Sequence, residues 1–270
     1  MIRKKIDCHL HTNMSPDGRV EPEKMILAAI DMGLEHICIT DHRDLLYNRL
    51  QFQGVIDVEK YVASLLPLKE KYADKIYVSI GLECGWKKEA EPGNLKDVPV
   101  KNLEYVINSI HEVNGDDSYY PETYAGKTKE QAYGDYLNAI KQSLDAPYPF
   151  HAVGHIGYAA RYAPYSDKKM RYVEFADCFD TILKKLIDKG TILELNSSVG
   201  STGVVSLPDT DVVKRYRELG GEEITFSSDA HTTNRICDGY ERIAQEVVNL
   251  GFGYFTVIQN GNKKHIKIED

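Results

Sequence analysis

The sequence lacks any hydrophobic run of the roughly 18 residues that a membrane-spanning helix needs. The basic segment Arg3-Lys4-Lys5 is followed by no apolar stretch of the length of a secretory signal. Cysteine is sparse, with five residues, an odd number, and no CxxC pair. These absences argue against a membrane protein and a disulfide-rich secreted scaffold, so we expect a cytoplasmic chain that does not bind membranes.

An excess of positive charge is also missing. The chain has 33 Lys and Arg against 41 Asp and Glu, a net charge of -8, which argues against nucleic acid as a partner. An anionic substrate would therefore need a local positive centre. With 270 residues, 42% of them hydrophobic, the chain fits one barrel of about 250 residues. We find no repeat, low-complexity segment or linker, and expect a single domain over residues 1–270.

Strand and helix signals alternate along the chain. Helical spacing of apolar residues recurs at 58–72, 129–144 and 208–219, and helices are expected near Met25 and Phe179 as well. The alternation predicts a mostly parallel sheet with helices outside it, and seven or eight units favour a closed barrel. After a first strand at Ile6, strands are predicted at residues 36–40, 76–82, 104–110, 150–153, 192–195, 224–227 and 254–258, with a possible tail strand at 264–268.

Nearly every predicted strand ends in a polar or metal-binding residue. In barrels of this type the active site lies at the carboxyl-terminal rim of the strands. Six of the nine histidines fall at such ends, which random placement would not produce, so the sequence predicts a metal site at this rim. The residues are His9 and His11, His42, Glu83, His111, His155, Asn196, and Asp229 with His231.

The spacing of several of these residues along the sequence strengthens the prediction of a metal site. His9 and His11 share one face of a strand, and we expect Asp229 and His231 to repeat that geometry. Glu83 ends an apolar strand, where burial of a carboxylate costs free energy unless a cation pairs with it. That cation could be a metal ion, or it could be a nearby Lys or Arg in a salt bridge. A carboxylate has two oxygens, so Glu83 could bridge two metals. Mixed imidazole and carboxylate ligands suit Zn, Fe or Mn, without choosing among them.

Other residues are ambiguous by themselves. Asp17 lies in Ser15-Pro16-Asp17-Gly18, which already makes a good turn. Arg161 follows the predicted strand that ends at His155, and it is either a phosphate clamp or a surface residue. Arg235 is a weaker candidate for the same phosphate-binding role. The following tyrosines cluster in loops over the expected site, as substrate walls or as loop packing: Tyr119, Tyr120, Tyr124, Tyr158, Tyr162 and Tyr165.

The remaining histidines and cysteines give weaker signals. His151 shares strand parity with His155 but lies farther from the strand end, so we expect it outside the ligand set. His36 begins a strand at the opposite rim and is expected to be ordinary. Cys8 and Cys38 are expected to behave as small buried hydrophobes rather than as ligands or disulfides. Cys84 is interpreted in the same way.

Taken together, the motifs resemble the polymerase-and-histidinol-phosphatase (PHP) family. The resemblance covers almost the whole chain, and it implies a distorted TIM-like barrel of about seven βα units and a stand-alone phosphoesterase of the histidinol-phosphatase type. The motifs that carry it are His9-Leu10-His11-Thr12, Ser15-Pro16-Asp17-Gly18, Thr40-Asp41-His42, Gly81-Leu82-Glu83, Ser109-Ile110-His111, Gly154-His155 and Ser228-Asp229-Ala230-His231.

The resemblance also implies two to three divalent metal ions. One would be held by His9, His11, Glu83 and Asp229; a second would share Glu83 and take His111 and His155; a third would use Asp17, His42 and His231. Such ions produce hydroxide from bound water near neutral pH, and this hydroxide would attack phosphorus. Glu83, Asp229, His231 and Arg161 are the predicted catalytic residues, and Arg161, Arg235 and Asn196 the predicted substrate-binding residues.

The substrate is less well determined by the sequence. Histidinol-phosphatases of this type typically carry a further arginine soon after the Glu-x-Asn strand, but residues 196–202 contain none. Gly157 stands where an acidic residue would be expected. We therefore expect a small phosphorylated metabolite, with L-histidinol phosphate first and another small phosphate ester as the alternative. A non-catalytic, metal-binding accessory domain is the second alternative.

Overall fold

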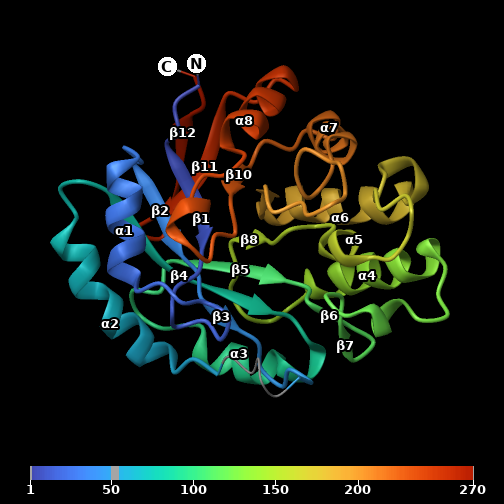
Figure 1. Ribbon diagram of the computed structural model, residues 1–270, viewed down its shortest axis with the longest axis horizontal. Coiled ribbons are helices and arrows are strands. Elements are labelled where there is room, and N and C mark those ends of the chain that lie inside the picture. The colour runs from blue at the N-terminus through green and yellow to red at the C-terminus, as the bar shows by residue number, and fades with distance from the viewer. Residues whose placement is uncertain (1, 50–54, 270) are drawn as a thin grey trace.

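Seven parallel strands form a nearly closed barrel in the computed structural model, which describes residues 2–49 and 55–269 (Figure 1). This confirms the predicted barrel and its seven units. A two-residue strand, β3 (His42–Arg43), pairs with β4 beside the main path. In order around the barrel the strands are β1 (Ile6–Leu10), β2 (His36–Ile39), β4 (Tyr77–Gly85), β5 (Tyr105–Ser109), β8 (Ala152–Val153), β9 (Ile192–Asn196) and β10 (Ile224–Ser227).

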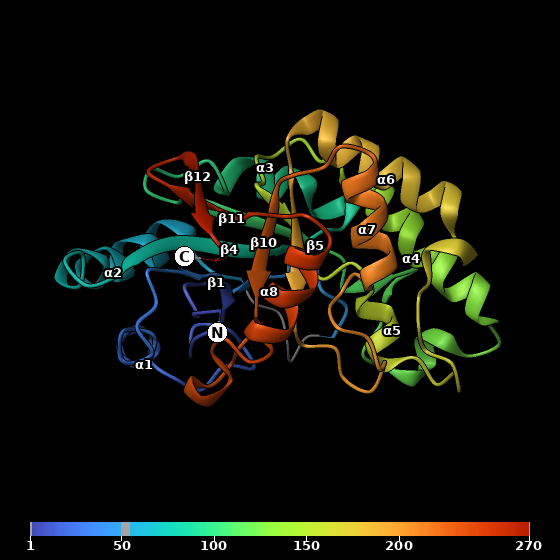
Figure 2. The ribbon, with the colours of Figure 1, turned by 90° about the horizontal axis from the view of Figure 1, so that it is seen from above.

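The helices lie around the outside of the strands (Figures 1 and 2). The predicted amphipathic helix near Phe179 is α6, which buries Phe179, Ile182, Leu183 and Leu186 and ends at Gly190 with a left-handed φ of 63°. Among the described residues, no helix has the length and apolar content to cross a membrane. The helices are α1 (Pro22–Asp31), α2 (Val58–Lys71), α3 (Glu91–Asp97), α4 (Lys129–Ser143), α5 (Tyr158–Tyr162), α6 (Ala176–Lys189), α7 (Thr210–Glu218) and α8 (Tyr240–Asn249).

The barrel closes at a seam between β1 and β10. A single parallel bridge joins Leu10 to Ala230 there, and the His11 backbone N donates to the Ala230 carbonyl at 2.9 Å. The Asp7 carboxylate crosses the same seam, because it accepts from the Ser228 backbone N at 2.9 Å and from the Ser228 hydroxyl at 2.5 Å. A side chain thus contributes part of the pairing that backbone groups supply between the other strands.

The amino ends of the strands are covered by an antiparallel hairpin of β11 (Tyr254–Gln259) and β12 (Asn262–Lys267). The hydroxyl of Ser79 on β4 donates to the Ile258 carbonyl at 2.7 Å, which ties the hairpin to the barrel. The predicted last strand is therefore real, but it pairs with the tail strand and not with the parallel sheet. Lys5 donates to the Lys267 carbonyl at 2.9 Å, so the two ends of the chain lie side by side (Figure 1).

Some element boundaries differ from the sequence prediction. β4 runs on to Gly85, so Glu83 lies within the strand and not at its end. Asp229 has a left-handed φ of 56° and follows the end of β10 at Ser227, so the regular extended geometry predicted for residues 229–231 is interrupted at Asp229. Beyond the predicted elements, a short strand β7 (Asp116–Asp117) pairs with β6 (Glu112–Val113). The long loops remain at the carboxyl ends of the strands, where they shape a cavity.

Candidate metal centre

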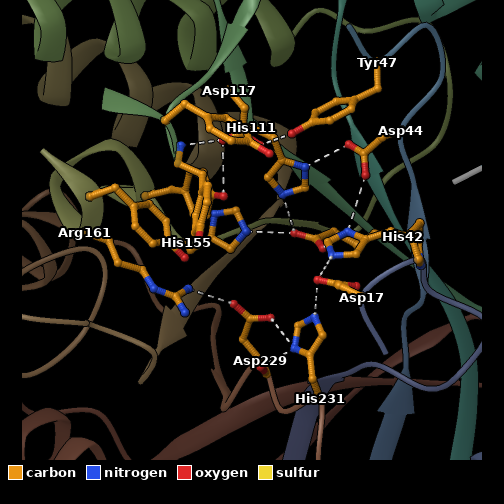
Figure 3. Close-up of a pocket in the computed structure, with 16 residues that line it drawn as sticks. Asp17, His42, Asp44, Tyr47, His111, Asp117, His155, Arg161, Asp229 and His231 are labelled. Carbon is orange, nitrogen blue, oxygen red and sulfur yellow. Dashed lines mark hydrogen bonds and ion pairs between the residues drawn. The ribbon is translucent and has the colours of Figure 1, made fainter. Parts of the chain in front are cut away.

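A cavity of about 410 Å³ opens at the carboxyl-terminal end of the barrel. Figure 3 shows His42, His111, His155, Asp229 and His231 directed into a common space, although they come from distant parts of the chain. His9 and His11 lie beneath this space and are fully buried. The structure thus brings together all nine residues that the sequence predicted as metal ligands.

Glu83 lies at the middle of this group and is fully buried. Its position inside β4 directs the carboxylate across the barrel, where its neighbours come from β1 and the residue after it, from β3, and from the loops after β5 and β8. The two carboxylate oxygens lie 2.8–3.5 Å from nitrogens of five imidazoles: His9, His11, His42, His111 and His155. One carboxylate therefore faces two sets of potential ligands, as a bridging residue must.

Asp229 and Asp17 extend the group on either side of Glu83. The Oδ1 of Asp229, which lies two residues beyond the end of β10, is 3.3 Å from the Nε2 of His11. Asp17 is nearer the mouth, where its Oδ2 lies 3.0 Å from the Nε2 of His231 and 3.7 Å from the Nε2 of His42. The turn that the sequence predicted at Asp17 is present, and it also brings the carboxylate to two imidazoles.

The donor atoms have the chemistry of a cation site. The Nε2 atoms of His9, His11 and His231, the Nδ1 of His42 and the Oε2 of Glu83 are buried without hydrogen-bond geometry to any described residue, although they approach one another closely. Five carboxylates line the cavity against one guanidinium, that of Arg161. The excess of four negative charges would be balanced by two divalent cations. The residues present therefore fit divalent metal ions.

The pKa values in the group show how strongly these charges interact. Burial alone would lower the pKa of His9, but Glu83, Glu194 and Asp229 raise it well above its ordinary value. Burial alone would raise the pKa of Glu83, yet the imidazoles around it hold that pKa well below the ordinary value. His11 differs, because burial and the neighbouring His231 and His42 lower its pKa. Strong attraction for positive charge is thus concentrated at Glu83, where a cation can replace the protons.

Two carboxylates that hold the imidazoles in place were missed by the sequence analysis. Glu194 on β9 lies 2.7 Å from the Nδ1 of His9 and also accepts from the His155 backbone N. Asp44 lies 2.8 Å from the Nδ1 of His111 and 3.4 Å from the Nδ1 of His42. A carboxylate on the far nitrogen fixes the ring and the tautomer of a metal-binding histidine. Glu194 carried a usable signal, since it is a charged residue within an apolar strand, as Glu83 is.

We expect Glu194→Gln to weaken metal binding or turnover by about 10- to 100-fold, because the amide keeps the contact to His9 but loses the charge. Metal content after dialysis and phosphate release would measure the effect. Glu104→Gln is the matched control, since Glu104 pairs with Lys69 at 2.7 Å and does not line the cavity. Equal metal retention in both variants would contradict a positioning role for Glu194.

Not every predicted binding residue reaches the cavity. Arg161 does, with its Nη1 3.4 Å from the Oδ2 of Asp229. Arg235 is instead paired with Asp238 at 2.5 Å, its side chain is 48% exposed, and it does not line the cavity. Asn196 is fully buried and bonds to the Ser198 backbone N at 2.8 Å, so it too is outside the lining. The structure therefore does not bring Arg235 and Asn196, two of the predicted substrate-binding residues, to the cavity lining.

The tyrosine cluster divides in the same way. Tyr119, Tyr120, Tyr158 and Tyr162 line the cavity, whereas Tyr124 and Tyr165 pack beneath the loops. Two further lining residues were not foreseen: Asp117 is 5% exposed and accepts from the hydroxyl of Tyr47 (Figure 3). The cavity therefore has aromatic walls and a second carboxylate-rich side beyond the imidazoles.

Comparison with known proteins agrees with this geometry. The family model described as PHP domain matches residues 7–198, a segment that contains Glu83 and most of the imidazoles. The chain belongs to the PHP domain family. Histidinol-phosphatase from Lactococcus lactis is 30% identical over 270 residues, covering 98% of this chain and 99% of the relative. A probable histidinol-phosphatase from Clostridium acetobutylicum is 32% identical over 230 residues, covering 85% and 88%.

Solved PHP structures share the fold. Histidinol phosphate phosphatase from Lactococcus lactis, crystallised with Zn, L-histidinol and phosphate, superposes with a TM-score of 0.87 at 28% identity, covering 97% of this chain and 99% of that one. A putative histidinol phosphatase from Listeria monocytogenes superposes with a TM-score of 0.76 at 21% identity, covering 88% and 99%. The barrel of this chain is thus the barrel of the PHP family along nearly its full length.

Proposed function

We propose that the protein is a metal-dependent histidinol-phosphatase, which hydrolyses L-histidinol phosphate to L-histidinol and phosphate. The observation that carries the proposal is the convergence of imidazoles, carboxylates and one guanidinium on a single cavity. End-to-end similarity to the Lactococcus lactis enzyme supports it, since that enzyme was crystallised with Zn and with both reaction products. The same coverage supports treating residues 1–270 as one catalytic domain.

The proposed metal ligands follow the contacts around three carboxylates. Glu83 would bridge two ions, one with His9, His11 and Asp229, the other with His111 and His155. Asp17 would hold a third ion with His42 and His231. When bound, divalent ions lower the pKa of a coordinated water and neutralise charge on phosphoryl oxygens. Zn is the ion for which a relative gives support, and Fe and Mn suit the same donors.

Arg161 would bind the phosphoryl group directly. Its guanidinium matches the spacing of phosphate oxygens and stays charged in the cavity. Among the described lining residues it is the only Lys or Arg, so positive charge for a dianionic ester comes from this side chain and from the metals. The contact to Asp229 at 3.4 Å holds the guanidinium beside the proposed ligands.

The cavity walls favour a phosphate ester that carries a cationic group. L-histidinol phosphate has an amine on the carbon next to its phosphorylated CH2 group and an imidazole at the far end. Asp117 lies on the tyrosine side of the cavity and is not among the proposed metal ligands. A buried carboxylate in that position would attract an ammonium group and would offer nothing comparable to a neutral sugar.

A panel of phosphate esters tests the proposal. Phosphate release from L-histidinol phosphate, nucleoside monophosphates and sugar phosphates would be compared for enzyme loaded with Zn or Mn, together with metal analysis. We expect kcat/KM for L-histidinol phosphate to exceed the others by about a hundredfold or more, because the Asp117 carboxylate can pair with a cationic group of that ester and not with an uncharged sugar or base. No phosphate release from any ester, or from an aryl phosphate, would contradict an enzymatic role and favour an accessory metal-binding domain.

A second candidate is hydrolysis of another small phosphate ester. The observation in its favour is that residues 196–202, which follow the Glu194-x-Asn196 strand, contain no arginine. The phosphate then meets one guanidinium instead of two, and the substrate preference can differ from that of other histidinol-phosphatases. In the same panel, this candidate predicts that a nucleotide or sugar phosphate is the best substrate, with the metal requirement unchanged.

A further inference from the structure

A second group of potential metal ligands lies inside the barrel, away from the cavity. It consists of Cys8 on β1 and His36 and Cys38 on β2, and all three side chains are fully buried. One nitrogen and two sulfur atoms of these residues lie within 4.8 Å of one another. His36 begins β2, and its ring contacts Gln259 on the hairpin that covers the amino ends of the strands. The cluster is therefore near the end of the barrel opposite the cavity.

The spacing suits a tetrahedral ion. The Nε2 of His36 lies 3.3 Å from the Sγ of Cys38. Ligands of a tetrahedral zinc, at about 2.3 Å for sulfur and about 2.0 Å for nitrogen, lie roughly 3.5 Å apart. The three donor atoms lie within 4.8 Å of one another, so side-chain shifts of about 1 Å or less would bring them to these separations.

His36 has the protonation state and the support of a metal ligand. Burial lowers its pKa to about 3, so the imidazole is neutral at physiological pH. The second nitrogen of His36, Nδ1, lies 3.1 Å from the side-chain amide of Gln259. Rotation of this amide by 180° would place its oxygen there, where it could accept a hydrogen bond from a protonated Nδ1. A polar group on the far nitrogen is what orients a ligating histidine. Nothing in the proposed phosphatase reaction uses this buried ring.

Tyr105 provides an independent sign of a polar centre. Its hydroxyl is buried and has no hydrogen-bond partner among residues 2–49 and 55–269. Burial raises the pKa of Tyr105, and the thiols of Cys8 and Cys38 raise it further. A buried hydroxyl without a hydrogen-bond partner costs free energy, so the polar group is unusual in this part of the barrel.

We propose that Cys8, His36 and Cys38 form a second metal site, separate from the PHP centre, that takes zinc or another thiolate-binding divalent ion. Both thiols lose a proton on binding, so two thiolates and a divalent cation carry no net charge, which suits a fully buried position. Because the site is enclosed, the ion would enter while the chain folds and would join β1 to β2 inside the barrel.

Cobalt substitution tests the proposal without reference to activity. The protein is produced in a medium in which Co²⁺ replaces zinc, and its near-ultraviolet spectrum is recorded. All proposed ligands of the PHP centre are nitrogen or oxygen atoms, so a sulfur-to-cobalt charge-transfer band must come from cysteine. We expect the band in the native sequence, its loss in Cys38→Ala, and one bound metal ion fewer per chain in that variant. Phosphatase activity should persist, so failure of this proposal is distinct from failure of the proposed function.

Cys84→Ala is the matched control, because Cys84 is an equally buried strand residue outside the cluster. It should keep both the band and the metal content. The proposal would be overturned by a native protein without the band, by a band that persists in Cys38→Ala, or by a Cys8–Cys38 disulfide in a thiol count under denaturing conditions. If Cys38→Ala does not fold, X-ray absorption of the zinc-loaded native protein decides, by presence or absence of sulfur at about 2.3 Å.

Discussion

Replacement of Glu83 by glutamine is expected to remove bound metal and phosphatase activity together. The two oxygens of Glu83 face five imidazoles at 2.8–3.5 Å in a fully buried position. Glutamine has nearly the same shape, so the strand and its packing are retained, but the negative charge is lost. Removing one partner of a buried ionic group costs about 3–5 kcal/mol. Since about 1.4 kcal/mol corresponds to a factor of ten, metal affinity should fall by roughly two to four orders of magnitude.

The measurement is metal content by elemental analysis after dialysis, together with kcat/KM for phosphate release. Glu91→Gln is a matched control, because Glu91 is also a buried glutamate, 6% exposed, but it bonds to the indole of Trp86 at 3.0 Å outside the cavity. That control should retain both metal and turnover. Native metal content and native activity in Glu83→Gln would remove the basis for a bridging carboxylate.

Arg161→Ala is expected to reduce turnover strongly while leaving the metals in place. Arg161 is the single guanidinium or ammonium group among the described residues of the cavity lining, and it is 3.4 Å from Asp229. Loss of one positioned donor to a developing negative charge costs about 10²- to 10³-fold in kcat. Arg161→Lys should fall between the alanine variant and the native protein, because an ammonium group keeps the charge but cannot bind two oxygens in one plane.

Arg235→Ala serves as the comparison for Arg161. Arg235 follows the same rim in the sequence, but its side chain is paired with Asp238 and half exposed outside the cavity. The structure therefore predicts native kinetics for Arg235→Ala, measured with the same ester and the same metal. A loss in Arg235→Ala as large as that in Arg161→Ala would mean that the rim closes over the substrate, in contradiction to the cavity described above.

The barrel was predictable because local patterns repeat along the chain. Alternating helix and strand signals gave seven or eight units, and the rule that active sites lie at the carboxyl ends of barrel strands brought His9, His42, His111 and His155 to one rim. These positions depend on strand endings, which the sequence shows directly. The hairpin β11–β12 was predicted as strands but not in its pairing, since the same apolar alternation suits a parallel or an antiparallel neighbour.

The residues that support the imidazoles could not be found in this way. Asp44 acts through a contact with His111, 67 positions away, and Glu194 through a contact with His9, 185 positions away. Such pairs depend on how distant strands align across the barrel, which one sequence does not reveal. The same reason applies to Asn196, which ends a strand as predicted but whose side-chain oxygen accepts from the Ser198 backbone N outside the cavity lining.

Metals bound at the seam between β1 and β10 would also stabilise the closure of the barrel. His9 and His11 lie on the β1 side of the seam, and Asp229 and His231 lie on the β10 side. Asp7 and Ser228 also meet at the seam, and they are 221 positions apart in the sequence. Ions bound by residues of both strands would join the two ends of the chain. These strands are far apart in the sequence, so the chain segment between them is a long loop whose closure costs the most entropy. Removal of the metals with a chelator should then destabilise β1 and β10 first. Amide hydrogen exchange in these two strands should become faster before any helix is lost.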